Sequence, residues 1–104
     1  MDLPPETLAQ LERLAASGIR LLPIVDLPRH FVFECDEFVA LVENVDGRFG
    51  GVGSPGLMTE RGFAPLIQRP AGPAFVCKDY ELPATPDQAA RAHAFFTLLL
   101  RAFR

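Results

Sequence analysis

The sequence predicts a single two-layer α+β domain, in which an antiparallel β-meander of five or six strands carries an N-terminal and a C-terminal helix on one face. Two observations lead to this prediction. Apolar residues at helical spacing are confined to the two ends of the chain, and short apolar runs separated by turn residues fill the segment between them. A length of 104 residues suits one hydrophobic core, so we expect one domain over residues 1–104.

The first helix is predicted from Pro5 to Ser17. Proline and glutamate open this segment, and Leu8, Leu11 and Leu14 then recur at helical spacing. Gly18 is expected to end the helix, because glycine adopts the left-handed conformation of a C-terminal cap without a Cβ penalty.

The second helix is predicted from Pro86 to about Arg101. Thr85 stands at the N-cap, and Gln88 stands where a capping box requires a glutamine or glutamate. The apolar stripe of this helix contains Ala92, Phe95, Phe96, Leu99 and Phe103. Such a stripe is wider than one small sheet needs, which indicates either a deeply embedded helix or a helix shared with a partner.

Six strands are predicted between the helices: Arg20 to Val25, His30 to Cys35, Phe38 to Val45, Arg48 to Val52, Gly62 to Gln68 and Ala74 to Leu82. Proline cannot donate a ladder hydrogen bond, so Pro23 and Pro65 favour a sheet edge or a bulge in their strands. The segment from Gly50 to Gly62 is predicted as a glycine-rich connection.

The best-defined hairpin has Asp36 and Glu37 as a two-residue turn. Such a turn sets three pairs that share one face of the sheet: Cys35 with Phe38, Phe33 with Ala40, and Phe31 with Val42. The same register places His30 opposite Glu43 on the other face. Agreement between the alternation of both strands and the turn is the strongest evidence for the sheet.

Charge and composition exclude several classes of partner. The net charge is -3 and Lys78 is the single lysine, so no basic surface for nucleic acid is expected. The start of the chain lacks the pattern of a secretory signal, and no apolar run approaches the length of a membrane span. We therefore expect a cytoplasmic protein without membrane contact.

The glycines at 51, 53 and 56 reproduce the G-x-G-x-x-G spacing of dinucleotide-binding loops. Pro55 and the approaching Gly62 leave no room for the helix that this motif requires, so dinucleotide binding is rejected. A second interpretation is an anion site at this connection, for which the candidate ligand-binding residues are Arg48, Gly51, Gly53 and Arg61.

The cysteines and histidines, Cys35, Cys77, His30 and His93, stand alone in the sequence, without the close pairs typical of metal sites. We predict no metal site and no cofactor. Both cysteines alternate with phenylalanines and are predicted to be buried free thiols. A disulfide between them stays open if their strands are neighbours.

The pairing of His30 with Glu43 resembles a catalytic base held by a carboxylate. A surface pair is the favoured interpretation, because no nucleophile can be placed beside it, and no catalytic residue is predicted. The acidic residues Glu34, Asp36 and Glu37 are interpreted as solvated charges at a hairpin end.

Three functional hypotheses follow, and a non-enzymatic, homodimerising protein-interaction module is the first. Its contact surface would be the second helix, through Phe95, Phe96, Leu99 and Phe103, or the uncovered face of the sheet. An apolar fraction of 49%, counted without glycine, motivates it. The alternative is a small-ligand binding or sensing domain with a pocket between the sheet and the helices, under the Gly50–Gly62 connection. The third hypothesis is an enzyme that uses His30, Glu43 or a cysteine.

Overall fold

The computed structural model describes residues 3–22 and 29–103. Within these residues the elements follow the order α1 (Pro5–Ala16), β1 (Arg20–Leu22), β2 (His30–Cys35), β3 (Phe38–Val45), β4 (Arg48–Val52), β5 (Gly56–Thr59), β6 (Gly62–Arg69), β7 (Gly72–Cys77), β8 (Tyr80–Pro83) and α2 (Pro86–Ala102). The α+β class and the antiparallel sheet are as the sequence predicts, but eight strands take the place of five or six.

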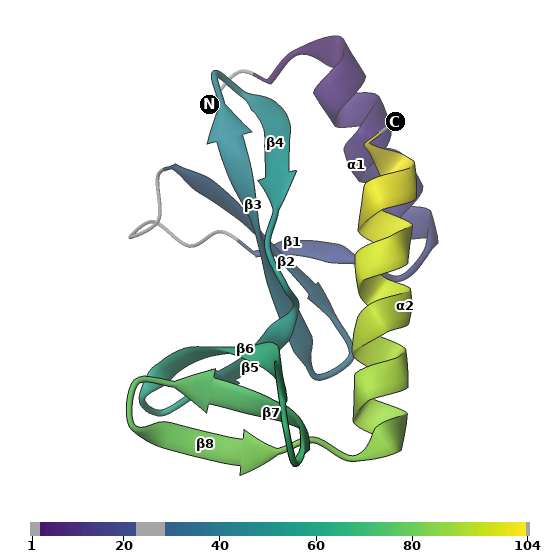
Figure 1. The fold of residues 1–104 in the computed structure, drawn as a ribbon. Helices are drawn as coiled ribbons and strands as arrows, with labels where there is room; N and C mark the ends of the chain where they lie inside the picture. Colours follow the sequence, from purple (N-terminus) through teal and green to yellow (C-terminus); the bar gives the residue numbers. More distant parts are fainter. Residues whose placement is uncertain (1–2, 23–28, 104) are drawn as a thin grey trace.

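The sheet is curled and consists of two parts that are joined in the middle (Figure 1). Its strand order is β1-β2-β3-β5-β6-β7-β8, and β4 also pairs with β3. One residue pair, Val39 with Gly56, links β3 to β5 and so joins the two parts. The long helix α2 runs beside both parts in Figure 1, and α1 lies beside the part that contains β1 to β4.

The helices cover one face of the sheet, in broad agreement with the prediction. Helix α1 contacts α2 and β1, whereas α2 contacts β3 and β4. The buried core between helices and sheet contains Leu14, Ile19, Phe31, Phe33, Phe38, Ala40, Val42, Ala64, Phe75, Cys77, Ala92, Phe95 and Leu99. Burial of this apolar surface is the main term that holds the helices on the sheet.

The C-terminus of α1 confirms the role predicted for Gly18. This glycine has a φ of 82°, and its N–H donates to the carbonyl of Ala15. The N–H of Ile19 donates to the carbonyl of Leu14, which completes a Schellman motif. Leu14 and Ile19 are both buried, so the cap also directs the chain from α1 into the core.

The N-terminal end of α1 is fixed to the turn between β3 and β4. Thr7 is buried, and its hydroxyl donates to the carbonyl oxygen of Gly47 at 2.9 Å. An ion pair between Glu6 and Arg48 lies beside this hydrogen bond. These contacts join residues about 40 positions apart in the sequence.

Helix α2 begins with the predicted capping box. The N–H of Gln88 donates to the Thr85 hydroxyl at 3.1 Å, and the N–H of Thr85 donates to the Gln88 side-chain carbonyl at 2.9 Å. At the other end of the helix, the ring of Phe103 stacks on Phe49 with a centroid distance of 4.3 Å. Neither helix in the described ranges has the length and apolar character that a membrane span requires.

The hairpin of β2 and β3 has the predicted register. Cys35 pairs with Phe38, Phe33 with Ala40, Phe31 with Val42, and His30 with Glu43. Asp36 adopts a φ of 55°, the left-handed conformation that a two-residue hairpin turn requires.

Two segments differ from the prediction and account for the larger strand number. The expected connection from Gly50 to Gly62 contains a further strand, β5, which pairs with β6. The expected strand from Ala74 to Leu82 is a hairpin, because Lys78 adopts a φ of 53° and reverses the chain. The part of the predicted first strand from residue 23 onward, with Pro23, lies outside the described residues.

Pro65 lies in β6, which is an interior strand and not an edge strand. Residues before Leu66 pair with β5, whereas Leu66 and the following residues pair with β7. Pro65 therefore occupies the point at which β6 changes partner, where a proline without an N–H is tolerated.

Gly56 lies where three strands meet. It pairs with Val39 of β3 and with Pro65 of β6. A Cβ atom at this position would lie 2.0 Å from the carbonyl oxygen of Ala64 and 2.6 Å from the Cα of Pro65. Since both neighbours are main-chain atoms, no side-chain rotation can relieve such an overlap.

We predict that Gly56→Ala lowers the melting temperature by more than about 10 °C, because separation of the strands costs on the order of 3 kcal/mol. The measurement is thermal unfolding followed by circular dichroism. Gly51→Ala is the matched control, since a Cβ there meets only a Glu43 oxygen at 3.6 Å. Equal melting temperatures for the two variants would contradict the prediction.

Candidate functional site

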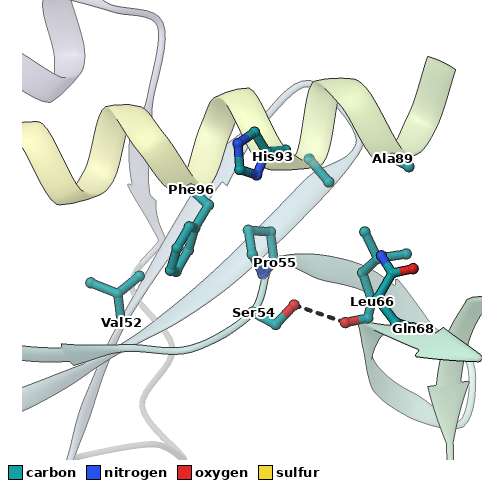
Figure 2. Close-up of a pocket in the computed structure, with 9 residues that line it drawn as sticks. Val52, Ser54, Pro55, Leu66, Gln68, Ala89, His93 and Phe96 are labelled. Atoms are coloured by element: carbon teal, nitrogen blue, oxygen red, sulfur yellow. Dashed lines mark hydrogen bonds between the residues drawn. The ribbon is translucent and has the colours of Figure 1, made fainter. Parts of the chain in front are cut away.

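A groove lies between α2 and the strands that cross beneath it (Figure 2). Its volume is about 310 Å³. The groove is lined by Val52, Ser54, Pro55, Leu66, Gln68, Ala89, Ala92, His93 and Phe96. Three segments that are distant in the sequence therefore form one surface: residues 52–55, the second half of β6, and residues 89–96 of α2.

The floor of the groove is held by main-chain and side-chain hydrogen bonds. The N–H of Leu66 donates to the carbonyl of Pro55 at 3.0 Å, and the Ser54 hydroxyl donates to the carbonyl of Leu66 at 2.9 Å (Figure 2). These bonds fix residues 54 and 55 against β6 although neither residue belongs to a strand.

The wall on the helix side follows from the position of residues on α2. Phe95 and Leu99 point into the core and are 2% and 0% exposed. Phe96 is half-buried and projects from α2 toward the segment that carries Val52 and Pro55 (Figure 2). Ala89 lies about two turns earlier on the same side, and its small side chain leaves the groove open.

The groove is apolar, with polar groups in three places. Most of the surface is apolar, and Ser54, Gln68 and His93 supply hydrogen-bonding groups. The apolar lining residues are Val52, Pro55, Leu66, Ala89, Ala92 and Phe96. Because the Ser54 hydroxyl donates to a main-chain carbonyl and not to His93, the two side chains do not form a nucleophile and base pair. The arrangement is suited to binding apolar groups.

The structure separates the four residues proposed for an interface. Phe95 and Leu99 are already enclosed by this chain's own core. Phe103 is half-buried and packs on Phe33 and Phe49. Phe96 alone among the four lines the groove, so any contact made by this side of α2 would involve Phe96 and its groove neighbours.

The four residues proposed for an anion site lie in different places. Arg48 forms its ion pair with Glu6 of α1. Arg61 lies 3.5 Å from Asp79 and 5.3 Å from the centroid of the Tyr80 ring. Gly51 and Gly53 line a different cavity, on the open face of the sheet.

Two of the three acidic residues near the first hairpin, Glu34 and Glu37, take part in ion pairs. Glu34 pairs with Arg20 of β1, and Glu37 pairs with Arg91 of α2 at 2.8 Å. Within the described ranges, no three histidine, cysteine, aspartate or glutamate side chains gather as metal ligands would.

The two cysteines are free thiols. Cys77 is buried, and its Sγ donates to the carbonyl of Arg61 at 3.4 Å. Cys35 is half-buried, and desolvation together with the charge of Asp36 raises the pKa of its thiol. A raised pKa lowers the fraction of reactive thiolate, so Cys35 has the character of a structural cysteine.

Comparison of this chain with protein-family models, with curated proteins and with solved structures finds no match. Function must therefore be inferred from the residues and surfaces of this chain itself.

Phe96 and, as an alternative, a pocket under the Gly50–Gly62 connection were predicted from the sequence, but the other individual residues that line the groove were not. Val52 and Pro55 stand between the glycines of the rejected dinucleotide motif, whereas Leu66 carries no motif. Nothing in the local pattern indicates that these residues meet beneath one helix. The sequence contained two signals: the excess of apolar residues on α2, and the glycine-rich connection from Gly50 to Gly62 that supplies part of the opposing wall.

We predict that iodoacetamide alkylates Cys35 at least about tenfold more slowly in the folded protein than in the unfolded protein at about pH 8. The reason is the raised pKa and partial burial of the thiol. Cys77→Ala leaves one thiol for measurement by mass spectrometry. Asp36→Asn should increase the rate modestly, and equal folded and unfolded rates would disprove the prediction.

Proposed function

We propose that this protein is a non-enzymatic, cytoplasmic protein-interaction module that associates with a second copy of itself through α2 and the groove beside it. The observation that carries this proposal is the position of Phe96. Its ring is half-buried at the edge of an apolar groove that the described residues of its own chain do not fill. Large aromatic side chains beside apolar pockets are frequent contact centres in protein interfaces.

A second copy is the occupant that suits this surface. A twofold interface brings the same patch of both subunits together, so the patch must provide both a projecting group and a recess. Phe96 and the groove lie side by side near the middle of α2 and meet this requirement. The adjacent exposed positions Ala90 and Ala94 are small, which allows a second helix to approach closely.

A small-ligand binding domain is the second candidate, and the volume of the groove favours it. About 310 Å³ lies at the lower end of the roughly 300–1,000 Å³ typical of small-molecule sites. Ser54, Gln68 and His93 would orient such a ligand through hydrogen bonds. A protein that stays monomeric and binds a small molecule in this groove would support the second candidate over the first.

We expect light scattering over a concentration series to give the mass of a dimer for the natural sequence and that of a monomer for Phe96→Glu. A carboxylate placed in a dry interface loses its hydration and opposes association. His93→Glu tests the same surface from the exposed rim, where a change does not disturb the core.

Ile67→Glu is the matched control, because Ile67 is 37% exposed on β6 and does not line the groove. It should leave the dimer intact. A monomeric natural protein at high concentration, or dimers that persist in folded Phe96→Glu and His93→Glu, would refute the proposed interface. A dimer that Ile67→Glu alone dissociates would move the interface to the open face of the sheet.

A further inference from the structure

A second groove crosses the face of the sheet that the helices leave open. It consists of two cavities of about 490 Å³ each, which share His30 and Glu43. One cavity extends toward Leu41, Phe63 and Pro65, where the two parts of the sheet meet. The other extends toward Asn44 and the turn that follows β3, and it is also lined by Arg29. Arg29 does not line the first cavity.

The carboxylate of Glu43 is held in place by the strand beside it. The N–H of Gly51 donates to Glu43 Oε1 at 3.1 Å. The register between β3 and β4 shifts here, so that Gly50 and Gly51 lie opposite Glu43. A Cβ on Gly50 would approach Glu43 atoms to 2.8 and 2.9 Å, and therefore the glycine makes room for this side chain.

Glu43 retains capacity to bind another donor. A carboxylate accepts several hydrogen bonds, and the described residues supply the bond from Gly51 to Oε1. His30 is the register partner of Glu43, but no hydrogen bond joins these two described side chains. The exposed carboxylate thus lines the cavity, and its second oxygen accepts no hydrogen bond from the described residues.

The wall opposite this carboxylate is apolar. Leu41 lies two residues before Glu43 in β3, so both side chains are on the same face of the strand. Phe63 and Pro65 of β6 complete the wall. The cavity therefore combines one fixed negative charge with an apolar surface. Its volume lies in the range of small-molecule sites.

We propose that this cavity binds a small ligand that carries an ammonium group on an apolar body. The ammonium group donates to Glu43, and the apolar body lies against Leu41, Phe63 and Pro65. Charge complementarity selects the class of ligand, since a cation gains a charge-assisted hydrogen bond and an anion is repelled by Glu43. This cavity adjoins the α2 groove and shares Val52 and Ser54 with it. The residues that the proposal uses, Glu43, Leu41, Phe63 and Pro65, line this cavity and not the groove. The proposal does not depend on the proposed dimer.

The test is a titration of the natural protein with 2-phenylethylamine, followed by two-dimensional NMR of the backbone amides. Saturable shifts are expected at Leu41, Gly51 and Phe63. The carboxylate 3-phenylpropionate, which has an apolar body of similar size, should bind at least about tenfold more weakly.

Glu43→Gln removes the charge and keeps an oxygen that can accept from Gly51. This variant should lose at least about tenfold in affinity for the amine, whereas Glu12→Gln on the exposed side of α1 should bind like the natural protein. The amide spectrum of each variant reports whether it is folded.

Three results would overturn the proposal: no saturable shift at these residues, equal binding of amine and carboxylate, or unchanged affinity in folded Glu43→Gln. If Glu43→Gln does not fold, the test is the affinity of the natural protein for the amine compared with its affinity for the carboxylate. Shifts confined to α2 and Leu66 would place the ligand in the other groove and also overturn the proposal. These amide shifts and affinities test the ligand site whether the protein is a monomer or a dimer, so failure of this proposal and failure of the proposed dimer can be told apart.

Discussion

The close approach of three main chains at Gly56 is the constraint on which the rest of the structure depends. The single residue pair of Gly56 with Val39 joins one part of the sheet to the other. Gly56 also lies against the carbonyl of Ala64, so the second part of the sheet takes its position from the same residue. Since α2 lies beside both parts, the groove beneath it and the cavity on the open face each depend on this crossing (Figure 1).

Features that depend on neighbouring residues were predictable from the sequence. The register of β2 and β3 followed from strand alternation and a two-residue turn, and the start of α2 followed from Thr85 and Gln88. Strand β5 was missed because four residues between turn signals carry too little periodicity, and its pairing depends on the distant Ala64 and Pro65. The hairpin at Lys78 was missed because lysine seldom adopts a positive φ.

Neither cavity could be derived from local pattern, because each is assembled from segments that meet only through the sheet. The stripe on α2 was noted as too wide for one small sheet, and the structure divides it. Phe95 and Leu99 complete the core, whereas Phe96 turns to the groove. In the same way, the pairing of His30 with Glu43 followed from the sequence, but the contact of Glu43 with Gly51 required the bulge in β4.

The outer strands of the sheet limit the ways in which another chain can attach. Strand β8 ends at Pro83, which has no N–H for a further ladder bond. The two glycines of β4 break the regular spacing of its main-chain groups. Addition of a foreign strand is therefore disfavoured at these two margins. The same property protects the protein against edge-to-edge aggregation.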